Sequence, residues 1–557
     1  MNYNLRSGII SRYGAIIVFI LGILLLTPKI WSETSITGQD EYWLSLRTPM
    51  ETLEHGSWLT PWVNDEPRLK KPPLLYWAIM LTYKIFGINL FAARIWGVLS
   101  GAGLALCSFL LYKKLFKKSG FLAGLITLAT MAIAIEGHRA MLDLPLAFFT
   151  CMAVYFALNW GEAGRFRWIL LSAVSLGLSF MVKGPIGLIF FGAATLSALT
   201  VFRKWGFAFS HRMQITAAFI LLLAICLPWP LAMAYIWPDY ISILKGEMAA
   251  RQHQELSILA PLSALRKGLV LIFPWTIIFI AASIHYLKNY SQAFTRKGLW
   301  LVFWFLISLV PCFFMGCFSR YMVPVIPAAC VLSANWLEEV PGAIKAILFR
   351  ISISLVAFFT FLFCIFFIWF QKGTLMALAC LFVIGMLLWI TFLKNNIWLA
   401  TLSVGILFAV LIGGLYPCLG INKLPAEIEK IVGSAKVASY NSSQPAMLSI
   451  RLKRSVKRVR SFSTGDVSLL RKFDGFLFVR ETEAEDFESL AGKLGITFNK
   501  DGCFRTFWSR KTWIRFIRED AEWDDWKKAI NLRSLADLRP GICYYRLCPG
   551  SAFYGLS

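Results

Sequence analysis

Charged side chains are scarce in this sequence. They make up 16% of the 557 residues, and 58% are hydrophobic, against about 25% charged and about 45–50% apolar in an ordinary soluble domain. This scarcity excludes an ordinary soluble protein. The apolar residues come in repeated long runs, each close to the roughly 20 residues that cross a bilayer as a helix. Because a spanning backbone must satisfy its own hydrogen bonds, the sequence predicts a polytopic α-helical membrane protein.

Metal-binding and nucleotide-binding motifs are also missing. The twelve cysteines form no Cys-x-x-Cys pair or Cys/His spacing, and His253, one of five histidines, has no second ligand at metal spacing, so no metal is inferred. Most cysteines lie in apolar runs, where they act as small hydrophobic residues. Cys503, Cys543 and Cys548 lie in the polar tail. A disulfide can form there, but its pairing cannot be deduced from the sequence.

Acidic residues are few beside basic ones, 31 against 56, which gives a formal net charge of +25. In a soluble protein such a charge would indicate nucleic acid. Much of it lies in short loops between the apolar runs, at Lys113-Lys114, Lys117-Lys118, Arg165 and Arg167, Arg203-Lys204 with Arg212, and Arg296-Lys297. The sorting of positive loops to the cytoplasmic side explains these clusters. Nucleic acid is therefore not an expected partner, and the amino terminus is predicted to be cytoplasmic.

The apolar runs predict about thirteen transmembrane helices. Their approximate ranges are 13–31, 89–112, 120–136, 142–160, 167–182, 185–202, 214–236, 268–287, 298–316, 322–337, 346–370, 374–393 and 397–416. The first run lacks a convincing signal-peptidase site, so it is expected to be a retained span. An odd number of spans places the carboxyl tail outside. We therefore expect a transmembrane domain over residues 1–416 and an extracytoplasmic domain over 417–557.

The tail is more polar than the rest and predicts a small α/β domain. Residues 476–479 are typical of a strand and 483–493 of a helix, and an Asp501-Gly502 turn between two aromatic segments predicts a hairpin. The tail also carries a basic cluster, Arg451, Lys453, Arg454, Lys457, Arg458 and Arg460. This cluster either faces anionic lipid or forms a solvated edge.

Two long loops, 32–88 and 237–267, lie on the face opposite the basic loops. Loops that carry function are expected on a rigid scaffold, so these loops are candidates for the functional site. In the first loop Trp43, Leu46, Met50 and Leu53 recur at helical spacing. The amphipathic helix that they predict begins near Asp40. It either lies in the membrane interface or packs on its own bundle.

Asp40 is the leading candidate for chemistry. An ionisable side chain beside the membrane is a functional hypothesis when it faces a cavity, although an acidic residue at a helix start can also be a cap. Glu41 is the weaker carboxylate, because neighbouring helix residues face different directions. Lys70 and Lys71 precede Pro72-Pro73, which keep the loop extended. This cationic turn suits a phosphate or anchors the loop on lipid headgroups, and Lys71 is favoured because it adjoins the prolines.

Further candidates lie in shorter loops of the same face. Arg139 and Asp143 are four residues apart, a spacing that predicts a pair on one helix face. Lys183-Gly184-Pro185 is predicted to be a structural break, from which Lys183 could also reach a substrate. The remaining phosphate candidates, chosen by their side of the membrane, are Arg251, Arg320 and Tyr321.

The order of these motifs resembles that of the polyprenyl-phosphate-dependent membrane glycosyltransferases of the GT-C type. The likeness is to bacterial aminoarabinose transferases of lipid A and to protein O-mannosyltransferases, and it covers about residues 10–340. It rests on Asp40-Glu41, Gly56-Ser57-Trp58, Lys71-Pro72-Pro73 with Tyr76-Trp77, Arg139 and Asp143, Lys183-Gly184-Pro185, and Arg320-Tyr321 with Pro324 and Pro327. The resemblance implies a GT-C fold in the bacterial inner membrane with a periplasmic tail domain.

The resemblance also implies an activity. Such enzymes transfer a sugar, with inversion, from a polyprenyl (undecaprenyl) phosphate to a lipid A-type, glycan or protein acceptor on the periplasmic face. Asp40 would then activate the acceptor and Asp143 would orient the site. Lys71, with Arg251, Arg320 and Tyr321, would bind the lipid phosphate. The alternative class is a lipid-linked sugar transporter, which would predict mid-span charges and related halves; the sequence has few of the former and no clear internal repeat.

Two residues depart from the pattern of the aminoarabinose transferases. Lys70 stands where they typically have a glutamate, and Trp43 stands where they have an arginine. The missing glutamate is proposed to help hold a metal in that family. The sugar and any divalent metal therefore stay open, and no cofactor is assigned.

Overall fold

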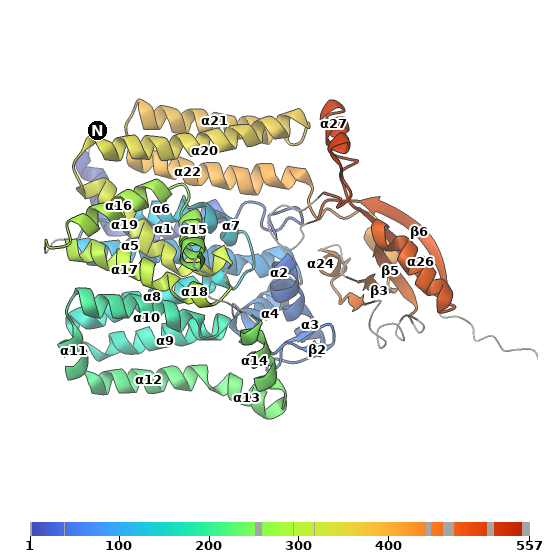
Figure 1. Cartoon of the computed structure of the whole chain (residues 1–557), viewed down its shortest axis with the longest axis horizontal. Coiled ribbons are helices and arrows are strands. Elements are labelled where there is room, and N and C mark those ends of the chain that lie inside the picture. Colours follow the sequence, from blue (N-terminus) through green and yellow to red (C-terminus); the bar gives the residue numbers. More distant parts are fainter. Residues whose placement is uncertain are drawn as a thin grey trace, which may run out of the picture.

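The protein is a bundle of long helices with a small sheet domain at one end, as the computed structural model shows (Figure 1). The structure describes residues 3–37, 39–250, 259–292, 295–316, 318–441, 447–460, 470, 473–508 and 517–548. Within these residues eight helices are long and apolar enough to cross a membrane, or nine if one bent pair counts as a span. The prediction of a polytopic helical membrane protein with a small α/β tail is confirmed.

Most helices of the membrane part follow the predicted apolar runs, whereas those at Leu74–Phe86, Trp205–Ser210 and Tyr240–Ala249 lie in segments predicted as loops. The helices are α1 (Tyr3–Leu26), α4 (Leu74–Phe86), α5 (Leu90–Phe116), α6 (Phe121–Leu128), α7 (Met131–Gly137), α8 (Asp143–Ala163), α9 (Phe166–Lys183), α10 (Ile186–Val201), α11 (Trp205–Ser210), α12 (Arg212–Cys226), α13 (Pro228–Ile236), α14 (Tyr240–Ala249), α15 (Ala260–Leu271), α16 (Thr276–Lys288), α17 (Arg296–Leu309), α18 (Pro311–Phe314), α19 (Ile326–Glu339), α20 (Ala343–Trp369), α21 (Thr374–Phe392) and α22 (Ile397–Val410). The amino end and α11 lie at the end of the bundle away from the sheet domain (Figure 1).

The predicted span 120–136 is broken into α6 and α7. The indole N–H of Trp275 donates to the carbonyl oxygens of Ile126 and Ala129, at 3.0 and 3.1 Å. A buried backbone carbonyl that loses its helical partner needs another donor. Trp275, which is fully buried, supplies that donor from a distant segment and allows the break inside the bundle.

The predicted span 268–287 is also not one straight helix. Its two parts, α15 and α16, meet at an angle of 118°, with Pro274 in the break. Proline has no N–H and clashes with the preceding turn, so a helix ends or kinks there. The break brings Phe273 to the bundle interior, where its side chain lines a cavity that is described below.

The first loop contains a helical segment that packs on its own bundle. It comprises α2 (Gln39–Glu41), a π-helical turn η1 (Tyr42–Arg47) and α3 (Thr48–Glu54), and a small ribbon β1 (Trp62–Val63) and β2 (Glu66–Pro67) follows. Leu46 and Met50 are fully buried. Of the two open interpretations of this helix, the structure therefore supports packing against the protein.

The tail domain is a five-stranded sheet in the order β4-β3-β5-β7-β6. Its strands are β3 (Lys436–Tyr440), β4 (Lys457–Val459), β5 (Gly475–Arg480), β6 (Thr497–Arg505) and β7 (Gly541–Cys548), with helices α23 (Ile428–Val432), α24 (Leu448–Leu452), α26 (Ala484–Lys493) and α27 (Trp523–Asn531). β3 pairs in parallel with β4 and β5, whereas β7 pairs antiparallel with β5 and β6. The strand predicted at 476–479 and the helix predicted at 483–493 are present as β5 and α26.

The hairpin predicted at Asp501-Gly502 is wrong. The segment is the single strand β6, with an irregularity in its pairing to β7 between Lys500 and Gly502. A side chain at Gly502 would meet the Tyr544 hydroxyl oxygen at 2.5 Å. Glycine, which has no side chain, leaves room for this tyrosine of the partner strand. A glycine inside a strand pattern marks such a bulge as readily as it marks a turn. A disulfide joins Cys503 to Cys543 across the two strands.

Part of the basic cluster of the tail docks on the first loop. Arg451 binds Glu33, with Nη2 and Oε2 3.0 Å apart, and Lys457 pairs with Asp65 at 2.5 Å. The Tyr42 hydroxyl also lies 2.6 Å from the Ser449 hydroxyl. These contacts connect the tail domain to the loop that carries Asp40.

Candidate functional site

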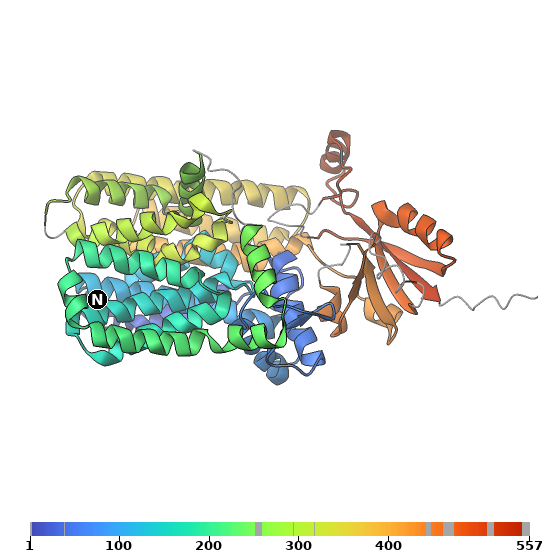
Figure 2. The same cartoon turned by 60° about the horizontal axis from the view of Figure 1, so that its bottom comes forward.

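The predicted functional residues gather at the end of the bundle that faces the tail domain. Figure 2 shows α14 and the first-loop helices between the bundle and the sheet. Asp40 lies in α2, Asp143 is the first residue of α8, and Lys183 is the last residue of α9. Arg320 lies in a 3-10 turn, η3 (Ser319–Val325), just before α19. Four segments far apart in the chain thus supply one site.

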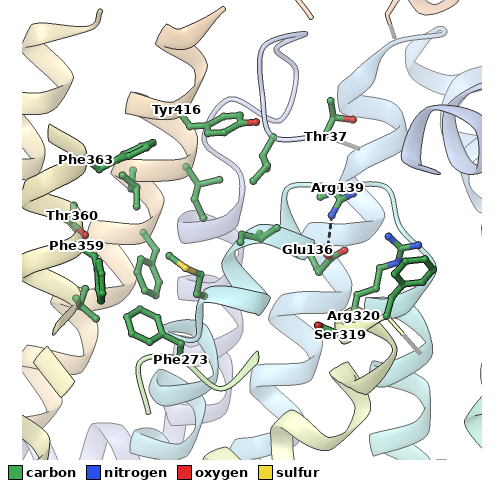
Figure 3. Close-up of a pocket in the computed structure, with 18 of the residues that line it drawn as sticks. Thr37, Glu136, Arg139, Phe273, Ser319, Arg320, Phe359, Thr360, Phe363 and Tyr416 are labelled. Atoms are coloured by element: carbon green, nitrogen blue, oxygen red, sulfur yellow. Dashed lines mark hydrogen bonds and ion pairs between the residues drawn. The ribbon is translucent and has the colours of Figure 1, made fainter. Parts of the chain in front are cut away.

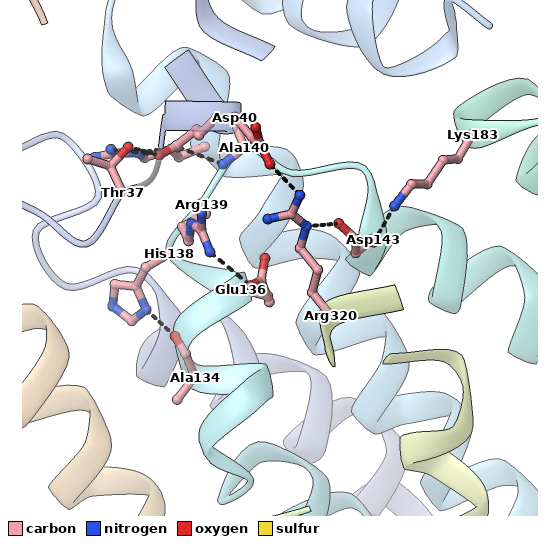
Figure 4. A network of polar contacts seen from close by, with 12 residues as sticks. Thr37, Asp40, Ala134, Glu136, His138, Arg139, Ala140, Asp143, Lys183 and Arg320 are labelled. Atoms are coloured by element: carbon pink, nitrogen blue, oxygen red, sulfur yellow. Dashed lines mark hydrogen bonds and ion pairs between the residues drawn. The ribbon is translucent and has the colours of Figure 1, made fainter. Parts of the chain in front are cut away.

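A chain of ion pairs joins these four residues (Figure 4). The Arg320 guanidinium contacts the Asp40 carboxylate, and its Nε lies 3.6 Å from Asp143 Oδ2. Asp143 also pairs with the Lys183 ammonium. The Asp40 side chain is 42% exposed, whereas those of Arg320 and Asp143 are 14% and 1% exposed. Asp40 is therefore the member of this network that an incoming molecule can reach.

The position of Arg320 between two carboxylates fixes its charge. Burial of the guanidinium opposes ionisation, but the charges of Asp143 and Asp40 outweigh burial and raise the pKa of Arg320. The ring of Tyr321 lies 4.0 Å from the Lys183 Nζ. A cation above an aromatic face is stabilised electrostatically. The two cations are thus held in place by carboxylates and by an aromatic ring.

A polar cavity of about 620 Å³ opens beside this network. Asp40, Lys70, Lys71, Asp143 and Lys183 line it, together with Arg320 and Tyr321. Its lining contains six Lys or Arg side chains and four Asp or Glu side chains. The excess of cations suits an anionic ligand such as a phosphate. The structure thus places Asp40 and Lys71 on one cavity.

Lys70 and Lys71 share a partner that the sequence did not reveal. Both ammonium groups lie near the Glu247 carboxylate of α14, at 3.6 and 3.5 Å. The Lys71 side chain is 13% exposed and that of Lys70 is 52% exposed. Lys71 is therefore held inward, while Lys70 lies at the rim.

A second, apolar cavity of about 370 Å³ adjoins the polar one, and Figure 3 shows Arg320, Glu136 and Arg139 at one part of its wall and aromatic rings at another. It shares Asp40, Phe318 and Arg320 with the polar cavity. The rest of its wall is mainly hydrocarbon and aromatic, with Met131, Ile135, Phe273, Val356, Phe359, Phe363, Phe408, Leu411, Ile412 and Tyr416. The two cavities therefore meet at Asp40 and Arg320, with cations on one side and apolar walls on the other.

Arg139 and Asp143 do not pair with each other, so that prediction is wrong. Arg139 binds Glu136 at 2.9 Å, and both line the apolar cavity. The reason is that α7 ends at Gly137 and α8 begins only at Asp143, so the two residues do not share a helix face. Spacing of four brings side chains together only within one helix.

Glu41 lines neither cavity and is fully buried. Its oxygens accept hydrogen bonds from the Arg94 side chain at 2.9 Å and from the Ala140 backbone N–H at 2.8 Å. Burial alone would raise the pKa of Glu41, but the charge and hydrogen bonds of Arg94 prevail and lower it. Glu41 therefore fastens the Asp40 segment to α5 and to the 138–140 turn.

Buried polar atoms around Asp40 point to a polar ligand. Within the described part of the chain, Asp143 Oδ2, Arg320 Nε, Glu136 Oε2 and Arg139 Nε are buried and have no hydrogen-bond partner, although the first two form an ion pair with each other at 3.6 Å. Such atoms normally have a partner, and an exception calls for an explanation. All four belong to residues that line one of the two cavities.

Among the charged lining residues, five were not singled out from the sequence as site residues, namely Glu66, Arg68, Glu136, Glu247 and Arg460. Arg460 belongs to the basic cluster of the tail domain, and it reaches the polar cavity of the membrane part. Arg251 and His253 lie outside the described residues. Among the described residues no group of three or more His, Cys, Asp or Glu side chains is placed to hold a metal ion.

The membrane part matches a family model described as dolichyl-phosphate-mannose-protein mannosyltransferase, over residues 70–231. An undecaprenyl phosphate-alpha-4-amino-4-deoxy-L-arabinose arabinosyl transferase of Pseudomonas savastanoi pv. phaseolicola is 26% identical over 239 residues, 41% of this chain and 43% of that protein. An uncharacterized protein of Aquifex aeolicus is 30% identical over 139 residues, 25% of this chain and 28% of that protein. The chain thus matches less than half the length of either relative.

The similarity to a solved structure extends over nearly the whole chain. The crystal structure of ArnT from Cupriavidus metallidurans bound to undecaprenyl phosphate superposes with a TM-score of 0.71 at 17% identity, covering 98% of this chain and 100% of that one. At this identity the match establishes a shared fold, tail domain included. The resemblance to GT-C glycosyltransferases of the aminoarabinose-transferase and protein mannosyltransferase type, which the order of motifs predicts, is therefore confirmed in sequence and in fold.

Proposed function

We propose that the chain transfers a sugar from a polyprenyl phosphate to an acceptor at the outer face of the bacterial inner membrane. The observation that carries the proposal is that Asp40 and Arg320 line both an apolar cavity and a cation-rich cavity. A lipid-phosphate sugar has parts that suit each side, a hydrocarbon chain and an anionic headgroup. The named relatives act on or bind polyprenyl phosphates, which agrees with this chemistry.

The transfer assigns separate tasks to the two kinds of side chain. The acceptor hydroxyl or phosphate attacks the anomeric carbon, and the bond from that carbon to the phosphate oxygen breaks with inversion. Asp40, the exposed carboxylate of the network, takes the proton of the acceptor, which is general-base catalysis. The negative charge that develops on the leaving lipid phosphate is stabilised by Lys71 and Arg320 in the polar cavity.

Asp143 has a supporting task in this proposal. Its side chain is 1% exposed and contacts both Lys183 and Arg320, so it orients the cations and is not accessible as a base. Glu41 likewise positions the Asp40 segment through Arg94. Lys183 and Tyr321 complete the wall of the polar cavity.

Two observations support the proposed side of the membrane. The disulfide Cys503–Cys543 lies in the tail domain, which is at the same end of the bundle as α2, the helix of Asp40, and disulfides form in oxidising compartments such as the periplasm. The basic loops near α11 lie at the opposite end, as expected for a cytoplasmic face. Both observations support a periplasmic site and a cytoplasmic amino terminus.

The acceptor is expected to carry negative charge. Arg460 brings a cation from the tail domain to the polar cavity, where Lys70 is half exposed. Together with the other cations that line the cavity, they are more than one phosphate requires. A lipid A-type acceptor has anionic groups that suit them, and an acidic glycan would also fit.

The test is the change Asp40→Asn in proteoliposomes supplied with the polyprenyl-phosphate sugar. Mass spectrometry of lipids and envelope glycans from a deletion strain first identifies the sugar that is lost. Asp40→Asn is expected to lower transfer by about 10²–10⁴-fold, the usual contribution of a general base, with the fold intact. Glu66→Gln is the matched control, because Glu66 also lines the polar cavity but lies in β2, outside the ion-pair network.

Two results would contradict the proposal. Full transfer activity of the Asp40→Asn protein would remove Asp40 as the base. Accumulation of the intact lipid carrier on the inner face of the deletion strain, without any transfer by the purified protein, would favour the transporter.

A further inference from the structure

A third cavity lies at the opposite end of the bundle, where the proposed transfer does not take place. It has a volume of about 410 Å³ and is bounded by the ends of α5, α8, α10 and α17 and by α11 and α12. Its inner wall is apolar, with Val154, Leu158, Phe191, Ala194, Ala198, Phe202 and Ile215. The Trp300 indole N–H donates to the Ala194 carbonyl oxygen at 2.8 Å, so this ring adds an apolar face to the wall.

The rim of this cavity is strongly basic. Lys114, Lys117, Lys204 and Lys297 line it with a single carboxylate, Glu162. Glu162 pairs with Lys114 and, at 3.3 Å, with Lys117. Lys204 lies 5.5 Å from the Phe207 ring. Neither Lys204 nor Lys297 has a carboxylate partner among the residues that the structure describes.

The outer side of the same end is built to lie at a membrane surface. Trp205, Phe209 and Met213 are exposed by 44%, 70% and 78%, and they come from α11 and the start of α12. Aromatic side chains concentrate at the level of the lipid headgroups. The basic rim therefore lies at headgroup level, with the apolar wall reaching toward the acyl chains.

We propose that this cavity binds an acidic glycerophospholipid of the cytoplasmic leaflet. The lysines of the rim hold the phosphate, and one acyl chain occupies the apolar wall. Basic pockets between transmembrane helices on the cytoplasmic side bind anionic headgroups in this manner. A free anion would use only the lysines. A zwitterionic lipid carries a cation beside its phosphate, which offsets the attraction of the lysines, so a lipid with a net negative charge matches both halves better.

The proposal predicts a specific loss of lipid binding. The full-length protein, stripped of lipid in detergent, is titrated with phosphatidylglycerol and the bound lipid is counted by native mass spectrometry. The double variant Lys204→Gln/Lys297→Gln is expected to bind about 30-fold more weakly, which corresponds to about 2 kcal/mol for two lysines. Sugar transfer should be unchanged, because neither lysine belongs to the proposed active site.

Two further variants make the result specific. Arg165→Gln/Arg167→Gln removes the same charge from a predicted cytoplasmic loop outside the cavity, and it should leave phosphatidylglycerol binding within about twofold. Ala198→Trp fills the apolar wall and should weaken binding although all four lysines are present. Equal binding of phosphatidylglycerol and phosphatidylcholine, or equal loss in the two charge variants, would overturn the proposal. Binding of glycerol 3-phosphate as tight as that of the lipid would also overturn it, since the site would then be one for a soluble anion.

Discussion

The contact between Asp143 and Lys183 gives the most decisive prediction about the site. Their side chains are 1% and 5% exposed, so the pair is removed from water. Replacing one member of a buried pair leaves the other charge without compensation and costs about 3–5 kcal/mol. Asp143→Asn is expected to destabilise the protein by about this amount. Lys183→Met is expected to cost less, because Asp143 keeps Arg320 Nε at 3.6 Å.

The double variant Asp143→Asn/Lys183→Met removes both charges together. No isolated charge is left, so the cost should be smaller than the sum of the single changes by about 1–3 kcal/mol. The control is the pair Lys118–Glu339, whose side chains are 58% and 36% exposed. The same cycle of changes there should give a coupling below about 1 kcal/mol, as for exposed pairs.

Unfolding of the purified protein in detergent, followed by intrinsic fluorescence in increasing denaturant, measures all four stabilities. Transfer activity is measured on the same variants to distinguish an effect on function from an effect on stability. Both variants that carry Asp143→Asn lose the contact between Arg320 and Asp143, so both should have lower activity. The double variant should recover stability but stay at least about tenfold slower than the unchanged protein, the loss expected for a misplaced group. Strictly additive stability changes would refute the buried pair, and full activity of the double variant would refute the orienting task of Asp143.

Three further predictions address other parts of the site. Lys71→Gln should raise the KM for the lipid-phosphate donor about tenfold, and Lys70→Gln should raise it less than about threefold. The Lys71 side chain is 13% exposed and that of Lys70 is 52% exposed, and a charge at the rim is screened by water. Steady-state kinetics of both variants tests this prediction. Burial lowers the pKa of His138 to about 4, below its value of about 6.5 in the unfolded chain. The unfolded state therefore binds the proton more tightly, and stability falls from pH 6.5 to pH 4 by up to about 3 kcal/mol; His138→Gln should remove that part of the slope in unfolding curves. Gly97→Ala would place a methyl 2.4 Å from the Arg139 carbonyl oxygen and should cost about 1–3 kcal/mol, whereas Gly161→Ala, with open space around it, should be neutral in the same unfolding assay.

The membrane fold could be predicted because its signal is carried by composition. Runs of apolar residues long enough to span a bilayer need no knowledge of their neighbours, and a helix occupies each predicted range. The breaks inside two ranges could not be predicted in the same way. The break before α7 depends on Trp275, which is more than a hundred residues away in the chain, and only packing brings its N–H to the freed carbonyls.

The site residues were predictable as candidates, but their partners were not. Asp40, Asp143 and Arg320 stand out because charged side chains are rare beside apolar runs. Their contacts, Arg320 with Asp40 and with Asp143, join residues separated by 177 or more positions in the chain, and no local spacing encodes such contacts. Arg94 was a missed signal. It is a charge within a long apolar helix, and it turned out to hold Glu41.

The carboxylates in the polar cavity bear on how the proposed enzyme could release its product. Lys71 pairs with Glu247, Lys183 with Asp143, and Arg320 with Asp40, so a phosphate that binds one of these three cations exchanges with a carboxylate. The donor is a phosphodiester with one negative charge, whereas the lipid phosphate left after transfer is a monoester with a charge of up to about −2. Cations without carboxylate partners would therefore hold the product more tightly than the donor. The carboxylates of the cavity reduce this difference in affinity between product and donor. When the product phosphate leaves, a neighbouring carboxylate pairs again with the cation that the phosphate had bound. Binding energy is useful for turnover when it is greater in the transition state than for the bound ground states, and this paired arrangement favours turnover over retention of the product.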